Sequence, residues 1–413
     1  MVQGSSQYIL VTWSELVTAF REVEPATASV VMRALPRLVE AYLKGCLDSV
    51  EPVLSGTCDA LLDDAMWVQL EYLPVLCRHV YTQIGPALGM LMDNMMSQYS
   101  SVLASSGGTS NKQRQILEGQ LAWMVNAVGA IIGGHYSVSS GRPLHSVSAP
   151  SRAPSIDIMQ MKPGDELIDA DLSRRVLQLL QPLAAAGQRS IPQLEVALVY
   201  FLSNLKFAVL YCDQVASAES GGPGYRASGV ASRRMPGSSA PLVPREVQQS
   251  IEERLGLGDQ TTLMRMVAEK LIHNFTTWAD TAEVMDCTVD LFLDLAAGDR
   301  SGKMLLKCDV VQWVLKSHAE LPFLQSFEAR RQRTIFYSGL VCLLVHQWGD
   351  GQPLMAFMQP LIDNLKQIGS LSDAELQAPN TRAGIVNVAC DLRGIIEAAT
   401  SSQIYQVNYW HFE

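Results

Sequence analysis

Apolar side chains recur every three or four residues in successive segments of the chain, and short breaks separate these segments. Three stripes show the pattern: Leu263, Val267, Leu271 and Phe275, then Met285, Val289, Phe292 and Ala296, then Leu306, Val310 and Val314. Such spacing places the side chains on one face of an α-helix. Because one such helix cannot bury its stripe alone, the pattern predicts consecutive helices that pack side by side.

A pair of such helices recurs about every 40 residues in the second half of the chain. We predict helices within Thr262–Ala297, then in Lys303–Ser317 and in its successor Leu324–Gln347. This period is typical of the two-helix repeats of HEAT and armadillo proteins. We therefore predict an all-α fold, an α-solenoid built as a superhelix of antiparallel helix pairs. Stacks of this kind usually serve as binding surfaces rather than as catalytic scaffolds.

Helical patterns also fill most of the first half of the chain. Ser14 and Pro25 are predicted to mark the starts of two helices within residues 8–50. Further helices are predicted within 58–99, Gln115–Gly133, Ala170–Ala186 and Pro192–Val215. The segment Gln115–Gly133 is the most apolar of these and is apolar on both faces near its end, which predicts contacts with helices on two sides.

Stretches rich in Ser, Gly and Pro interrupt the helices and lack the apolar period that a helix needs. They set the predicted organisation: helical repeats in 1–136, a flexible loop in 137–169, a helical repeat in 170–215, a disordered insertion in 216–245, and helical repeats in 246–413. The two series of repeats are predicted to be the first and second parts of one solenoid.

Composition narrows the possible functions. The hydrophobic fraction of 48% supports a large core, and the formal net charge of −10 argues against a nucleic-acid partner while permitting a basic protein partner. The eight cysteines form no CxxC pair and lie mostly among apolar residues, which predicts buried thiols rather than disulfides. Neither a signal-peptide pattern nor an apolar run long enough to span a membrane is present, so we predict a soluble intracellular protein.

The sequence offers little that would carry catalysis, and we predict no catalytic, cofactor-binding or metal-binding residues. Gly298–Lys303 has three residues between its glycines and is followed by Met304, whereas a phosphate-binding loop needs four residues and then Ser or Thr. A turn between helices is therefore the preferred interpretation. The seven histidines occur singly, and Cys77 and His79 are predicted to lie on different faces of a helix. An enzyme would need a convergent polar pocket that the sequence does not indicate.

Charged clusters are the remaining candidates for partner binding. The densest basic segment is Arg330-Arg331-Gln332-Arg333, which we interpret first as a solvated helix face. In the alternative interpretation, its arginines line the inner surface of the solenoid and meet an acidic patch on a partner. Asp63-Asp64 and the pair Asp290 and Asp294 are interpreted as solvated faces, with partner contacts as the alternative. Asn274-Phe275-Thr276 matches a glycosylation sequon, which we interpret as a chance match.

Several blocks of sequence resemble the exportin-7 family of nuclear transport receptors, within the importin-β superfamily. The blocks are Gly119–Val125, Val128–Gly134, Leu291–Leu295, Val311–Leu315, Arg333–Tyr337 and Asp391–Ile395. Their order and separation are similar to the central portion of such receptors.

This resemblance implies a superhelix of HEAT repeats that binds the GTPase Ran in its GTP form together with protein cargo bearing a nuclear export signal. It also implies docking on the FG-repeat proteins of the nuclear pore and shuttling between nucleus and cytoplasm, without membrane insertion. The alternative is a HEAT-type scaffold, or interaction module, that is indifferent to Ran, including a truncated receptor fragment. Binding that depends on the nucleotide state of Ran discriminates the two.

Overall fold

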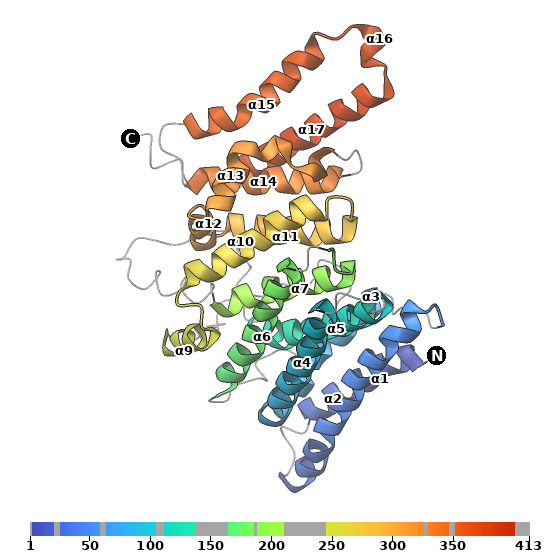
Figure 1. The fold of residues 1–413 in the computed structure, drawn as a ribbon. Helices are drawn as coiled ribbons and strands as arrows, with labels where there is room; N and C mark the ends of the chain where they lie inside the picture. Colours follow the sequence, from blue (N-terminus) through green and yellow to red (C-terminus); the bar gives the residue numbers. More distant parts are fainter. Residues whose placement is uncertain are drawn as a thin grey trace. The chain divides into compact units, whose positions relative to one another are not determined.

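The computed structural model describes residues 2–19, 25–57, 63–104, 111–137, 164–185, 188–209, 245–325, 329–346 and 352–400. All regular secondary structure in these ranges is helical, which confirms the predicted fold class (Figure 1). The chain divides into two compact units, Met1–Val215 with Ser232–Gly258, and Ala216–Ala231 with Asp259–Glu413. Each unit is built from helix pairs stacked side by side, as an α-solenoid requires.

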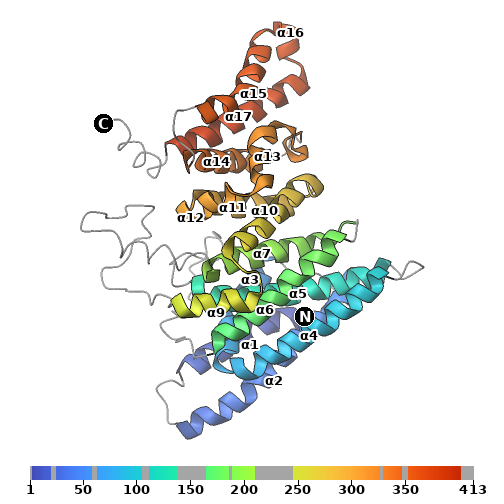
Figure 2. The same cartoon turned by 60° about the vertical axis from the view of Figure 1, so that its left-hand side comes forward.

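The first unit packs its helices in two rows (Figures 1 and 2). One row holds α1 (Val2–Ala19), α3 (Asp63–His79), α5 (Asn111–Ser137) and α7 (Pro192–Val209). The other holds α2 (Pro25–Leu54), α4 (Tyr81–Ala104), α6 (Asp165–Ala185) and α9 (Arg245–Leu255). Each helix contacts its neighbours along the row, so the apolar stripes are buried by repetition of one kind of interface.

Helix α5 is the core of the first unit, in contact with α3, α4, α2 and α7. A Cβ added at Gly129 would lie 3.1 Å from the Cα of Phe201, so the backbones of α5 and α7 approach closely there. Among the described residues, α5 is the helix long and apolar enough to cross a membrane by length and composition, but 83% of its most apolar window is buried inside the protein. The expected contacts on two sides are confirmed, and α5 has the burial of a core helix.

The second unit repeats the arrangement. The helices α11 (Ala282–Ala297), α14 (Arg330–His346) and α17 (Pro379–Ala399) form one row. Beside this row lie α10 (Gln260–Thr277), α12 (Asp299–Leu305), α13 (Asp309–Ser317), α15 (Gln352–Gly369) and the short α16 (Asp373–Leu376) (Figures 1 and 2). Two 3₁₀ turns, η3 (His318–Glu320) and η4 (Pro322–Gln325), connect α13 to α14.

Four phenylalanines form the core where these elements meet. Phe275, Phe292, Phe323 and Phe336 come from α10, α11, η4 and α14, and each is fully buried. Phe275 lies 5.7 Å from Phe292, 5.4 Å from Phe323 and 5.2 Å from Phe336 between ring centroids. Aromatic pairs at such distances contribute about 0.5–1.5 kcal/mol each beyond the area they bury. This cluster joins three helices and a turn into one body.

Several predicted boundaries were wrong. The segment Lys303–Ser317 is two helices, α12 and α13, because the chain turns at residues 306–308, where the Gln312 amide donates to the Leu306 carbonyl at 2.7 Å. Leu324 belongs to η4, α14 begins at Arg330, and Gln347 lies outside the described residues. Ser14 lies inside α1 and is fully buried, so it marks no helix start, whereas Pro25 does begin α2.

The predicted linkers fall mostly outside the described residues. Where the structure does describe their edges, α6 begins at Asp165, inside the segment 137–169, and α9 begins at Arg245, the last residue of the segment 216–245. Helix α9 packs on α6 and belongs to the first unit, although the sequence groups it with the repeats of 246–413.

Candidate protein-binding surface

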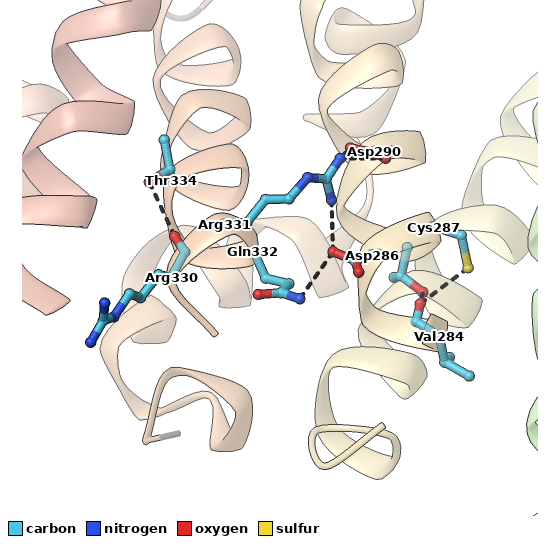
Figure 3. A network of polar contacts seen from close by, with 9 residues as sticks. Val284, Asp286, Cys287, Asp290, Arg330, Arg331, Gln332 and Thr334 are labelled. Atoms are coloured by element: carbon cyan, nitrogen blue, oxygen red, sulfur yellow. Dashed lines mark hydrogen bonds and ion pairs between the residues drawn. The ribbon is translucent and has the colours of Figure 1, made fainter. Parts of the chain in front are cut away.

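The basic segment at the start of α14 lies between α11 and α17. Arg331 extends toward α11 and donates to Asp286 at 2.7 Å and to the two carboxylate oxygens of Asp290 at 3.0 and 2.9 Å (Figure 3). The Gln332 amide also donates to Asp286, at 2.9 Å. Asp286 and Asp290 are four residues apart, so one face of α11 presents both carboxylates to one guanidinium. We call these four side chains the ion-pair ladder.

The three charged side chains of the ion-pair ladder are exposed, whereas Gln332 is buried. The side chains of Arg331, Asp286 and Asp290 are 55%, 43% and 53% accessible to solvent. Surface ion pairs of this kind contribute about 0–1 kcal/mol each, because water and salt screen them and ordering the long side chain costs entropy. A partner that offers its own charges can therefore replace these contacts at small cost. The charged side chains of the ladder therefore form an exposed polar surface.

Arg333, two residues further along α14, has a different role. It donates to both carboxylate oxygens of Asp391 in α17, at 2.8 and 2.5 Å, and to the Leu324 carbonyl of η4. The two side chains are 8% and 2% exposed. Burial raises the pKa of Asp391, while the charge and hydrogen bonds of Arg333 oppose that rise. This pair joins α14 to α17 and is inaccessible to a partner.

The predicted basic cluster is therefore not one surface. Arg330 is exposed, Arg331 spans to α11, Gln332 is buried beside Asp286, and Arg333 is buried against α17. The interpretation as a solvated face is wrong for Arg333, and Asp290, also interpreted as solvated, is bound by Arg331. Asp294 is half-buried, and the side chains of Asp63 and Asp64 lie outside the description.

A second set of exposed ion pairs lies in the first unit, on the row of α4, α6 and α9. Arg175 forms a bidentate pair with Asp93 at 2.8 and 2.9 Å. Arg254 of α9 forms another with Asp171 of α6, at 2.9 and 2.8 Å. Sequence analysis did not predict these pairs, because about 80 residues separate the partners and either arginine alone has the pattern of a solvated side chain.

The residues considered for chemistry have structural roles. Gly298 separates α11 from α12, and the Ser301 hydroxyl donates to the Leu295 carbonyl at 2.6 Å, so the predicted turn between helices is confirmed. Burial raises the pKa of the Cys77 thiol to about 12, which leaves it protonated and unreactive. His79 bonds to the Val75 carbonyl through Nδ1 at 2.7 Å.

The sequon and the cysteines were the remaining sequence candidates for chemistry. Asn274 is fully buried and its amide donates to the Thr288 hydroxyl at 3.1 Å, so the sequon asparagine is inaccessible. Six cysteines are free within the described ranges, while Cys58 and Cys212 lie outside them. In the described part of the chain, His, Cys, Asp and Glu side chains form no group of three that is arranged to hold a metal ion.

Comparison with known proteins places the chain in a family. The family model described as "Exportin-7-like, TPR domain" matches residues 49–149 and 151–332. Ran-binding protein 17 of Homo sapiens is 26% identical over 97% of this chain and 34% of its own length. Ran-binding protein 16 of Drosophila melanogaster is 26% identical over 95% of this chain and 32% of its own length. Exportin-7-B of Xenopus laevis is 24% identical over 98% of this chain and 34% of its own length.

The chain thus spans about a third of the length of these curated relatives, and the alignments run along nearly all of it. The tetratricopeptide unit named by the family model is, like the HEAT unit, a stacked pair of helices. The resemblance inferred from the sequence blocks is confirmed: the chain belongs to the exportin-7-like family.

Proposed function

We propose that this chain is part of a nuclear transport receptor that binds the GTP form of Ran together with protein cargo. The observation that carries the proposal is the family match, supported by relatives named for Ran binding and for export that align along 95–98% of the chain. The receptor acts by binding, and none of its residues performs a covalent step. It shuttles between nucleus and cytoplasm and docks on FG-repeat proteins of the pore.

The ion-pair ladder of α11 and α14 is the surface of the second unit that we assign to a polar partner. Its two carboxylates and one guanidinium are exposed and already paired, so a partner replaces existing ion pairs and no bare charge has to be desolvated. Many modest contacts of this kind give specificity and a fast association rate more than affinity. Binding through such contacts is reversible, and a transport receptor requires reversible binding because it must release its partners.

Coupling between Ran and cargo is proposed to arise from the stacked helix pairs. Each interface between neighbouring helices adjusts slightly, and both partners favour the same arrangement of the stack. Coupling of this type is commonly about 1–3 kcal/mol, which changes the affinity for cargo by about 5- to 150-fold. Hydrolysis of GTP on Ran removes the coupling and releases the cargo.

The second candidate function is a helical scaffold that joins other proteins without regard to Ran. The exposed ion pairs on the row of α4, α6 and α9 favour it, because they offer a second polar surface on the other unit. A scaffold has no reason to distinguish the nucleotide states of a GTPase.

The test is a pull-down of the full 413-residue chain on immobilised Ran loaded with a non-hydrolysable GTP analogue, beside the same Ran loaded with GDP. The proposed receptor is retained by the GTP form and washes through on the GDP form. Equal retention on both forms, or retention on neither, overturns the proposal that this chain binds the GTP form of Ran and leaves a scaffold or interaction module that is indifferent to Ran.

A further inference from the structure

A groove of about 540 Å³ lies between α2 and α5 of the first unit. Pockets that bind ligands commonly measure roughly 300–1,000 Å³, so the groove is large enough to hold side chains of a partner. Its walls come from one face of each helix and include Leu47, Asp48, Glu51 and Pro52 of α2 and Ile116 and Gln120 of α5. Both walls therefore belong to regular helices.

The groove opens beside the point where α2 and α5 touch. Val50 is buried there, and a Cβ added at Gly119 would lie 2.6 Å from its Cγ1 atom. In the next turn, the Gln120 amide donates to the Leu47 carbonyl at 3.4 Å. These contacts hold the two helices at a fixed separation, so the shape of the groove is set before any partner binds.

The α2 wall of the groove is rich in negative charge and hydrogen-bond acceptors. Asp48 and Glu51 are both exposed, and among the described residues Asp48 has no ion-pair partner. The last turn of α2 contains no basic residue to complement the negative end of its helix dipole. Pro52 has no N–H group, so the Asp48 carbonyl lacks its usual helical donor. A cationic group that donates several hydrogen bonds is complementary to this wall.

The rest of the groove is apolar. Leu47 and Pro52 on α2 and Ile116 on α5 are half-buried, so each still presents carbon atoms to the groove. Lysine matches such a mixed surface, because its four-carbon stem packs on apolar atoms while its ammonium group reaches polar ones. An apolar residue next to that lysine would add to the same contact.

A lysine of this chain already binds at the edge of the groove. Lys112 lies one turn before Ile116 on α5, and its Nζ atom forms an ion pair with Glu51 of α2 at 3.0 Å. The two side chains are 53% and 60% exposed, so water screens the pair and it can open at small cost. Glu51 is therefore able to exchange this ammonium group for one from a partner.

We propose that the groove between α2 and α5 binds a segment of a partner protein that presents a lysine beside an apolar residue. The lysine ammonium binds between Asp48 and Glu51, and its stem and the apolar neighbour contact Leu47, Pro52 and Ile116. The site lies in the first unit and requires neither the ion-pair ladder nor Ran.

The test is fluorescence anisotropy of the full chain with a fluorescein-labelled peptide, Ser-Leu-Lys-Leu-Lys-Ser. Asp48→Asn combined with Glu51→Gln keeps the shape of the groove and removes its two negative charges. Glu40→Gln combined with Glu253→Gln is the matched control, because it removes two exposed negative charges elsewhere. We expect the groove variant to raise the dissociation constant at least about tenfold and the control to bind like the wild type. The peptide with both lysines acetylated should lose binding to the same extent.

The Lys112–Glu51 pair gives a prediction of opposite sign. Lys112→Ala frees Glu51, so it should bind the peptide more tightly than the wild type does. Lys307→Ala is its control, because Lys307 is also exposed and lies in the second unit. Absence of peptide binding by the wild type overturns the proposal, as does equal binding by the groove variant and its control. Equal binding of the acetylated peptide, or weaker binding by Lys112→Ala, also overturns it.

Discussion

The same substitution at two glycines of α17 is expected to change stability in opposite directions. A Cβ added at Gly394 would lie 2.1 Å from the carbonyl oxygen of Thr334, 3.0 Å from its carbonyl carbon and 3.1 Å from its Cα. All three atoms are backbone of α14, so no side chain can move aside. At Gly384, ten residues earlier on the same helix, an added Cβ meets nothing within 4 Å.

The magnitudes follow from these distances. Replacing Gly by Ala inside a helix raises the free energy of unfolding by roughly 0.5–1 kcal/mol, since Ala loses less backbone entropy on folding. Gly384→Ala has this gain alone. Gly394→Ala has the same gain, but α14 and α17 must separate by about an ångström or more, and overpacking of this kind costs about 1–3 kcal/mol or more. Separation also loosens the Arg333–Asp391 pair, so we expect a net loss of about 2 kcal/mol or more.

The assay is unfolding in urea followed by circular dichroism, with the wild type and both variants measured side by side. Gly384→Ala should unfold at a higher urea concentration than the wild type and Gly394→Ala at a lower one. If both variants shift the midpoint in the same direction, or Gly394→Ala matches the wild type, the close approach of α14 and α17 is refuted.

Three further predictions concern the second unit. Asp391→Asn should lower the free energy of unfolding by about 3–5 kcal/mol, because it leaves the buried Arg333 without its counter-charge. Asp290→Asn, at an exposed ion pair, should lower it by less than about 1 kcal/mol. Equal losses for the two variants in urea unfolding contradict the assigned burial. Burial lowers the pKa of His318 from its usual value of 6.5. As pH falls, the His318 imidazole is therefore protonated in the unfolded chain before it is protonated in the folded chain. The contribution of the neutral imidazole to the free energy of unfolding is complete above pH 6.5 and is lost as pH falls toward the folded pKa. The loss, measured as the melting temperature against pH, should shrink in His318→Gln; an unchanged profile argues against the assigned burial. Phe275→Ala should cost about 3–5 kcal/mol in the same urea assay, since the ring touches three others, and a loss under about 1 kcal/mol contradicts the aromatic core.

The helical stripes were the most predictable feature of this chain. Leu263, Val267, Leu271 and Phe275 are all buried on α10, and the stripe from Met285 to Ala296 is buried on α11. The spacing of apolar residues alone determines which face of a helix is buried, so the sequence was sufficient to predict the buried faces of α10 and α11. It did not place the break between α12 and α13, because the Gln312 contact with the Leu306 carbonyl depends on the folded turn.

The candidate binding surface was harder to predict, and the basic segment shows why. Four consecutive residues on a helix point in four directions about 100° apart, so Arg330 to Arg333 cannot act as one patch. Their partners are distant in sequence: Asp290 is 41 residues from Arg331, and Asp391 is 58 residues from Arg333. Only the packing of α11, α14 and α17 brings these groups together, so the separate roles of the arginines follow from the structure.

We propose that the polar partner of the ion-pair ladder is GTP-loaded Ran, and calorimetric titration of charge-reversed variants tests this proposal most directly. Arg331→Glu reverses the ladder's exposed guanidinium, and Arg254→Glu reverses an equally exposed arginine that is bidentate to Asp171 on the other unit. We expect Arg331→Glu to weaken binding to GTP-loaded Ran at least about tenfold and Arg254→Glu to bind like the wild type. Equal affinities for all three chains would contradict it.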